Sequence, residues 1–220
     1  HGDIRMKRYY SEVSRSWRRF FVYTPAGYDT HTAEKYPVLY LLHGGGEDER
    51  GWATQGKTDL IMDNLIAEGK AKPMLIVMLD GNMASAGFNA GALKAFELMQ
   101  AVIPFVEDNY RVRKEADSRA LAGLSMGGIQ TLYAGLYHTD LFAHLGVFSS
   151  GWLPFYQKIA DGQYEFINKN KAAIDSQLRL LWIAMGGKED IAYQNCQNML
   201  KEFDTLKLKY TYSEYPGGHT

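Results

Sequence analysis

The chain has 220 residues, of which 46% are hydrophobic and 22% charged, an ordinary composition for one globular domain over residues 1–220. The formal net charge of −1 gives no electrostatic reason to expect a nucleic-acid or anionic-membrane partner. No apolar run approaches the roughly 20 residues of a membrane span. The single cysteine, Cys196, excludes an intrachain disulfide, and we expect it to be a small core residue inside a helix.

Short apolar runs alternate with amphipathic stretches along the chain. Strands are predicted, in chain order, at 19–24, 38–42, 74–79, 119–122, 144–148 and 178–184, with a half-buried edge strand at 206–212. Helices are predicted at 59–68, at 92–110 with Pro104 as a candidate kink, at 127–137 and at 191–203. This alternation indicates an α/β fold, in which a mostly parallel sheet has helices on both faces.

A G-x-S-x-G sequence, Gly123-Leu124-Ser125-Met126-Gly127, lies between a short predicted strand and a predicted helix. That is the placement of a nucleophile elbow, in which the serine hydroxyl projects from a sharp turn and the two glycines let strand and helix approach each other. A serine that only caps the helix is the structural alternative. We predict that Ser125 is the nucleophile of an acyl-transfer reaction.

A glycine-rich loop, His43-Gly44-Gly45-Gly46, follows the apolar strand predicted at 38–42. Glycine at the carboxyl end of a strand lets a backbone N–H turn toward the site and bind the oxyanion of a tetrahedral intermediate. We predict Gly45 as the first donor, with Gly46 as its alternative, and the N–H of Met126, at the start of the helix, as the second. His43 is expected to brace the loop.

A serine needs a base, and in hydrolases with this elbow the acid and then the histidine follow it in the chain. Downstream there are three histidines. His138 ends a helix and His144 opens a strand, so we interpret them as a surface cap and a packed residue. His219, in a glycine-rich loop after the last predicted strand, is the candidate base.

The acid should lie in the loop that follows the strand predicted at 178–184. Asp190 is the candidate, with Glu189 as the alternative, and either carboxylate could instead cap the next helix. Two aromatic residues follow predicted strand ends near the site, so we interpret Trp52 and Trp152 as candidate substrate-binding residues, although a single aromatic residue in such a place more often serves packing. No histidine or acid spacing suggests a metal site, and the mechanism needs no metal or cofactor.

The order of these motifs resembles the family-one carbohydrate esterases, a group of feruloyl and acetylxylan esterases related to esterase D. The resemblance runs from about Trp17 to His219. Its segments are Phe21-Val22-Tyr23-Thr24-Pro25, Tyr36-Pro37-Val38-Leu39-Tyr40-Leu41-Leu42-His43-Gly44, Asp63-Asn64-Leu65-Ile66-Ala67-Glu68-Gly69, Ala122-Gly123-Leu124-Ser125-Met126-Gly127-Gly128 and Gly217-Gly218-His219-Thr220.

This resemblance implies an α/β-hydrolase fold and a secreted enzyme without cofactor. At the matching positions it implies a triad of Ser125, Asp190 and His219, with the amides of Gly45 and Met126 as oxyanion donors. The implied substrate is feruloylated xylan, cleaved as an aromatic acid ester. Acetylated xylan is the alternative substrate, and a peptidase is disfavoured because the chain lacks room for a gating domain. A carbohydrate-binding protein without catalysis is the alternative outside enzymes.

The two chain ends add an expectation about the full-length protein. The chain starts at His1 rather than Met and stops one residue after His219, so we expect it to be trimmed at both ends. The stretch at 1–5 resembles the junction after a carbohydrate-binding module in longer relatives, so we expect that the full-length protein has such a module upstream. Relatives also continue past the histidine into a closing helix, and this chain departs from them there.

Overall fold

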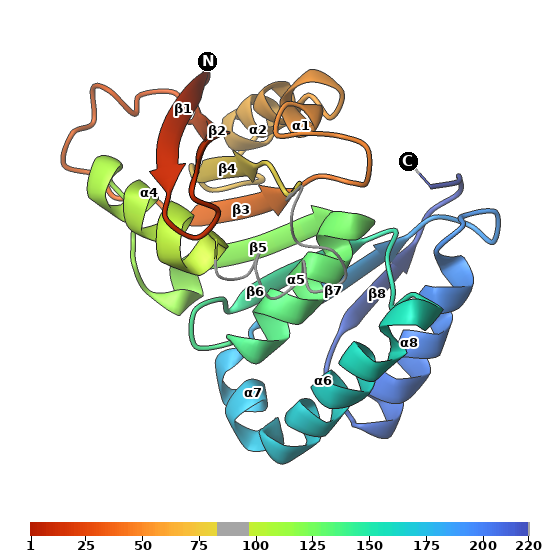
Figure 1. The fold of residues 1–220 in the computed structure, drawn as a ribbon. Coiled ribbons are helices and arrows are strands. Elements are labelled where there is room, and N and C mark those ends of the chain that lie inside the picture. The colour runs from red at the N-terminus through yellow and green to blue at the C-terminus, as the bar shows by residue number, and fades with distance from the viewer. Residues whose placement is uncertain (83–96, 220) are drawn as a thin grey trace.

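The computed structural model describes residues 1–82 and 97–219, and these residues form an eight-stranded sheet (Figure 1). The strand order is β1-β2-β4-β3-β5-β6-β7-β8. Strands β1 and β2 run antiparallel to their neighbours, and all other pairs are parallel. The strands are β1 (Asp3–Ser11), β2 (Ser16–Thr24), β3 (Val38–Leu42), β4 (Leu75–Leu79), β5 (Arg119–Leu124), β6 (His144–Phe148), β7 (Leu180–Met185) and β8 (Thr211–Glu214).

Helices pack against both faces of this sheet and create two apolar cores (Figure 1). The larger core lies under α4, α5, α6, α7 and α8, and the smaller one under α1 and α2. The helices are α1 (Gly51–Thr54), α2 (Thr58–Ala67), α4 (Ile103–Asn109), α5 (Met126–Tyr137), α6 (Gln157–Lys169), α7 (Lys171–Gln177) and α8 (Tyr193–Thr205), with a π-helical turn η2 (Leu98–Val102) and 3-10 turns η3 (Ala116–Ser118) and η4 (Pro154–Tyr156). The predicted α/β architecture is therefore confirmed.

Strand β4 shows why the central strands have continuous apolar sequences. All five of its residues are buried. Leu75, Val77 and Leu79 belong to the larger core, whereas Ile76 and Met78 point into the smaller one. Because successive side chains leave a strand on opposite faces, a strand covered on both sides must be apolar at every position.

Strand β1 and the helices α1, α6 and α7 were not predicted. Strand β1 carries charged residues on both faces and is held by pairing with β2 over its whole length. For the helix predicted at 92–110, residues 92–96 lie outside the described residues. The remainder consists of the π-helical turn η2 followed without a break by α4, and Pro104 lies at this junction as the second residue of α4.

The last predicted strand, at 206–212, is wrong for residues 206–210, because strand β8 begins only at Thr211. Residues before it complete the C-terminus of α8 in a Schellman motif. Lys207 has φ 54° and donates its N–H to Asp204 O, and the N–H of Leu208 bonds to Phe203 O. Leu208 is buried because it closes this helix end over the larger core. The alternation of apolar and polar residues that predicted a strand here therefore belongs to a helix C-terminus.

No helix among the described residues has the length and apolar character needed to cross a membrane.

Candidate active site

Ser125 occupies the turn between β5 and α5 in a strained backbone conformation, with φ 53° and ψ −110°. L-residues rarely adopt positive φ, and such strain persists only where the surroundings impose it. A Cβ on Gly123 would lie 2.3 Å from the carbonyl carbon of Gly127, and a Cβ on Gly127 would lie 2.5 Å from Leu42 O. The two glycines are therefore required by close backbone approach on both sides of the serine.

The last residue of β6 and a residue two positions beyond it hold the Ser125 turn from the neighbouring strand. The N–H of Ser125 donates to Phe148 O at 2.8 Å, and the Ser150 hydroxyl donates to Ser125 O at 2.8 Å. Ser150 was not predicted as a site residue, although its position two residues beyond the end of a strand next to β5 is a usable signal. These two bonds hold the Ser125 backbone, and therefore the direction of its hydroxyl.

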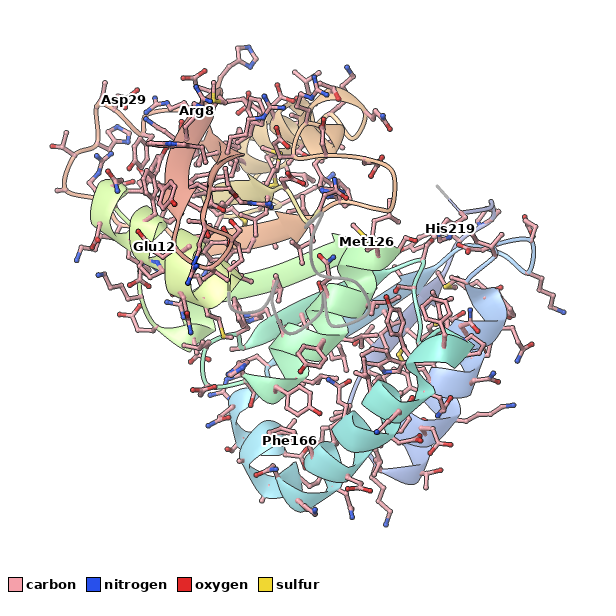
Figure 2. The ribbon with its side chains drawn as sticks, in the orientation of Figure 1. Arg8, Glu12, Asp29, Met126, Phe166 and His219 are labelled. Carbon is pink, nitrogen blue, oxygen red and sulfur yellow. The ribbon has the colours of Figure 1, made fainter. Side chains whose placement is uncertain are left out.

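The structure brings the three predicted triad residues into one hydrogen-bonded chain. His219 Nε2 lies 2.8 Å from Ser125 Oγ, and His219 Nδ1 lies 2.8 Å from Asp190 Oδ1. A carboxylate can only accept, so Nδ1 carries the proton and Nε2 is free to accept the serine proton. Figure 2 places His219 and Met126, the first residue of α5, at the end of the sheet to which the parallel strands point.

Asp190, not Glu189, faces the imidazole. Asp190 is 3% exposed, whereas Glu189 is exposed at the surface of the same loop. The Asp190 N–H donates to Gly187 O, and this turn directs the carboxylate inward. Gly187 N–H also donates to Gly217 O at 2.7 Å, so the loop that carries the acid is tied to the loop that carries the histidine.

The Asp190 carboxylate remains charged although it is buried. Burial raises its pKa, but the Ala192 N–H, which donates to Oδ1 at 2.8 Å, together with the Ser149 hydroxyl and His219, outweighs burial and lowers the pKa below its usual value. A negative charge next to Nδ1 fixes the tautomer of His219 and would stabilise the imidazolium form.

This lowered pKa predicts a pH-dependent stability. A carboxyl group with a folded pKa below its unfolded value of about 3.9 stabilises the fold above that value, and the contribution disappears as pH falls through the folded pKa. We expect the thermal midpoint of the wild type to exceed that of Asp190→Asn by a constant amount from pH 7 to about pH 5. Below about pH 4 the gap should close in calorimetric scans. A gap unchanged down to pH 3 would contradict the lowered pKa.

The glycine-rich loop after β3 lies beside the serine. Gly45 is exposed and lines the same cavity as Ser125, and no described residue accepts a hydrogen bond from its N–H. Gly46 has φ 82° and does not line the cavity. His43 is buried and braces the loop as expected: its Nδ1 donates to Gly44 O at 2.7 Å, and its Nε2 accepts the N–H of Gly81 at 2.9 Å.

A cavity of about 970 Å³ opens over the serine and histidine. Its aromatic lining comes from opposite sides of the site and consists of Trp52, Phe148, Trp182 and Tyr215. The structure thus places Trp52 in the cavity wall. Trp152, the other expected substrate-binding residue, is buried in the larger core and does not line the cavity, because the chain turns under α8 directly after Ser150.

The remaining singled-out residues lie outside this constellation. His138 follows the last residue of α5 as its C-cap, and His144 is half-buried at the start of β6. Cys196 is fully buried within α8, as expected for a core residue. Within residues 1–82 and 97–219, no group of three or more histidine, cysteine or acidic side chains is placed to hold a metal ion.

A serine on a strand-to-helix turn, hydrogen-bonded to a histidine and through it to a buried aspartate, is the arrangement found in serine hydrolases. The family model of the esterases, described as "Putative esterase", matches residues 11–220. The chain belongs to this esterase family, in agreement with the resemblance identified from its motifs.

Two curated relatives show which longer proteins contain such a chain. An endo-1,4-beta-xylanase/feruloyl esterase of Xylanibacter ruminicola is 39% identical over 161 residues, which cover 69% of this chain and 22% of the relative. Endo-1,4-beta-xylanase Y of Acetivibrio thermocellus is 31% identical over 201 residues, which cover 84% of this chain and 18% of the relative. The chain therefore spans about a fifth of the length of these curated relatives.

Solved structures share the fold over nearly the whole chain. A ferulic acid esterase from Anaeromyces mucronatus, in complex with ferulic acid, superimposes with a TM-score of 0.84 at 24% identity. The match covers 100% of this chain and 85% of the esterase chain. A mutant feruloyl esterase module from Clostridium thermocellum, complexed with sinapinate, has a TM-score of 0.79 at 28% identity, with coverages of 99% and 82%. The expected α/β-hydrolase fold is confirmed.

Proposed function

We propose that this chain is a serine carboxylic-ester hydrolase that releases ferulic or related hydroxycinnamic acids from arabinoxylan. The observation that carries the proposal is the hydrogen-bonded chain Ser125–His219–Asp190 at the base of a large cavity with aromatic walls. A volume of about 970 Å³ is ample for an aromatic acyl group, and tryptophan and phenylalanine side chains suit a planar ring. The relatives named feruloyl esterases support the same substrate class.

The proposed reaction proceeds by two acyl transfers. Ser125 Oγ attacks the ester carbonyl while His219 Nε2 takes its proton, and Asp190 stabilises the imidazolium that forms. The amides of Gly45 and Met126 bind the oxyanion, the latter at the N-terminus of α5. His219 then gives its proton to the leaving sugar hydroxyl. Water repeats the sequence on the acyl-enzyme, and the free acid leaves.

The sugar side of the substrate is proposed from the kind of protein in which related chains occur. Two relatives carry the name endo-1,4-beta-xylanase, and xylan fragments bearing feruloyl esters would supply the substrate for an esterase in such a protein. Because xylan is a polymer of the plant cell wall, the proposal includes secretion to the outside of the cell. An upstream carbohydrate-binding module is part of the same proposal.

A panel of esters tests the acyl preference. We expect kcat/KM on methyl ferulate and methyl p-coumarate to exceed that on a methyl ester of acetic acid by at least about 10-fold, because a matching apolar pocket discriminates by roughly 1–3 kcal/mol per group. The paired polymer assay measures ferulate and acetate released from feruloylated and from acetylated xylan. Faster acetate release would favour the acetylxylan alternative. Binding to xylan with no ester turned over would favour a carbohydrate-binding protein.

A further inference from the structure

The loop that carries the expected oxyanion donor is closed on itself by one acidic residue, Glu47. Gly44 O accepts the N–H of Glu47 at 3.4 Å, and Gly46, with φ 82°, occupies the third position of this four-residue turn, as in a type II turn. The Glu47 side chain then returns to the start of the turn, where its Oε2 accepts the Gly44 N–H at 2.9 Å. Glu47 thus binds both backbone groups of Gly44.

Glu47 is itself anchored from two neighbouring segments. The Asn82 side chain, beyond the end of β4, donates to Glu47 O at 2.7 Å. Gly51, the first residue of α1, packs against the carboxylate, and a Cβ there would lie 3.4 Å from Glu47 Cδ. These contacts fix the position of the glutamate, so it can fix the turn in its place.

The consequence falls on the glycine that follows. Gly44 has both its N–H and its C=O engaged, whereas the Gly45 N–H has no acceptor among the described residues. Gly44, Gly45 and Glu47 all line the cavity with Ser125. Without these hydrogen bonds the loop glycines would sample several backbone conformations. A preorganised donor stabilises the transition state more than a donor that must reorient during the reaction.

We propose that Glu47 is a positioning residue that holds the turn so that the Gly45 N–H points at the developing oxyanion. The inference rests on the proposed esterase function. Hydrogen bonds to an ionised acceptor are stronger than neutral ones, which suits a carboxylate to holding a mobile glycine loop. Glu47 acts through Gly45 and needs no contact with the substrate.

Kinetics of Glu47→Ala on p-nitrophenyl acetate test the proposal. Misplacement of a catalytic group by about 1 Å can cost roughly 10²-fold, so we expect kcat to fall about 10-fold to 100-fold while KM changes by less than about threefold. Affinity for a boronic acid, which forms a tetrahedral adduct with an oxyanion, should fall by a similar factor. Glu47→Gln retains an acceptor oxygen and should recover kcat to within about threefold of the wild type, with the same pH profile.

The control is Glu68→Ala, the same substitution at an exposed glutamate paired with Lys70 after α2, which should leave kcat and boronic acid affinity unchanged. If Glu47→Ala does not fold, Asn82→Ala removes the outer anchor and should lower kcat in the same direction. Unchanged kcat, a loss confined to KM, or a Glu47→Gln variant as slow as Glu47→Ala would each overturn the proposal. A wild type inactive on every ester would instead overturn the proposed function, and this inference with it.

Discussion

Ser125→Ala should lower ester turnover by at least about 10³-fold and leave the fold intact. The substitution removes Oγ, the only atom of the serine that reaches His219, and leaves a water molecule to attack the ester directly. Alanine keeps the Cβ and therefore tolerates the φ of 53° as well as serine does. We expect the thermal midpoint to stay within a few degrees of the wild type while kcat on methyl ferulate collapses.

The control for this variant is Ser176→Ala, which makes the same substitution at an exposed serine in α7 and should leave turnover unchanged. Mass spectrometry after treatment with a phosphonate ester adds a second measurement. The wild type should gain one phosphonyl group, and Ser125→Ala should gain none. Near-normal turnover by Ser125→Ala would show that the nucleophile is a different residue.

The turn that carries Ser125 is the part of the candidate site that the sequence predicts best, because its requirements are local. Both glycines that the turn requires lie within one stretch of five residues, Gly123 near the end of β5 and Gly127 in the first turn of α5. The acid is harder to assign. Glu189 and Asp190 are chemically equivalent in a loop, and only the turn in which the Asp190 N–H meets Gly187 O decides which carboxylate is buried.

Features that depend on contacts between distant segments could not be predicted from the sequence. Strand β1 has charged residues on both faces, and its pairing with β2 decides its conformation. Helix α6 contains Gly162, which weakens a local helix signal, and it is stabilised by packing against α5. The return of the Glu47 side chain to Gly44 depends on the positive φ of Gly46, which a run of three glycines permits but does not specify.

Trp152 shows the limit of reading a ligand site from a strand end. Trp152 follows β6 closely enough to lie either in the cavity wall or in the core. The close approach of Gly151 to α8 decides between these two positions. A Cβ on Gly151 would lie 2.5 Å from the Cys196 N, so the chain passes tightly against that helix and Trp152 enters the core. Trp182, on β7, lines the cavity although its strand sequence is simply apolar.

The largest effect on stability is expected for Gly127→Ala, at the second glycine of the turn. The new methyl group would lie 2.5 Å from Leu42 O and 2.8 Å from His43 O, distances that real Cβ atoms do not show. Both oxygens belong to backbone at the end of β3, which is paired on both sides with β4 and β5 and cannot retreat alone. We expect a loss of about 3 kcal/mol or more in the free energy of unfolding.

A matched glycine in a helix separates this steric effect from the general effect of adding a methyl group. Gly162 is exposed in α6, and a Cβ there would meet nothing closer than Tyr137 Oη at 3.9 Å. Gly162→Ala should therefore raise the free energy of unfolding by about 0.4–1 kcal/mol, since alanine loses less backbone entropy on folding. Urea denaturation of both variants measures the two effects with opposite signs. A Gly127→Ala variant as stable as the wild type would mean that β3 and α5 do not approach each other as closely as the turn at Ser125 requires.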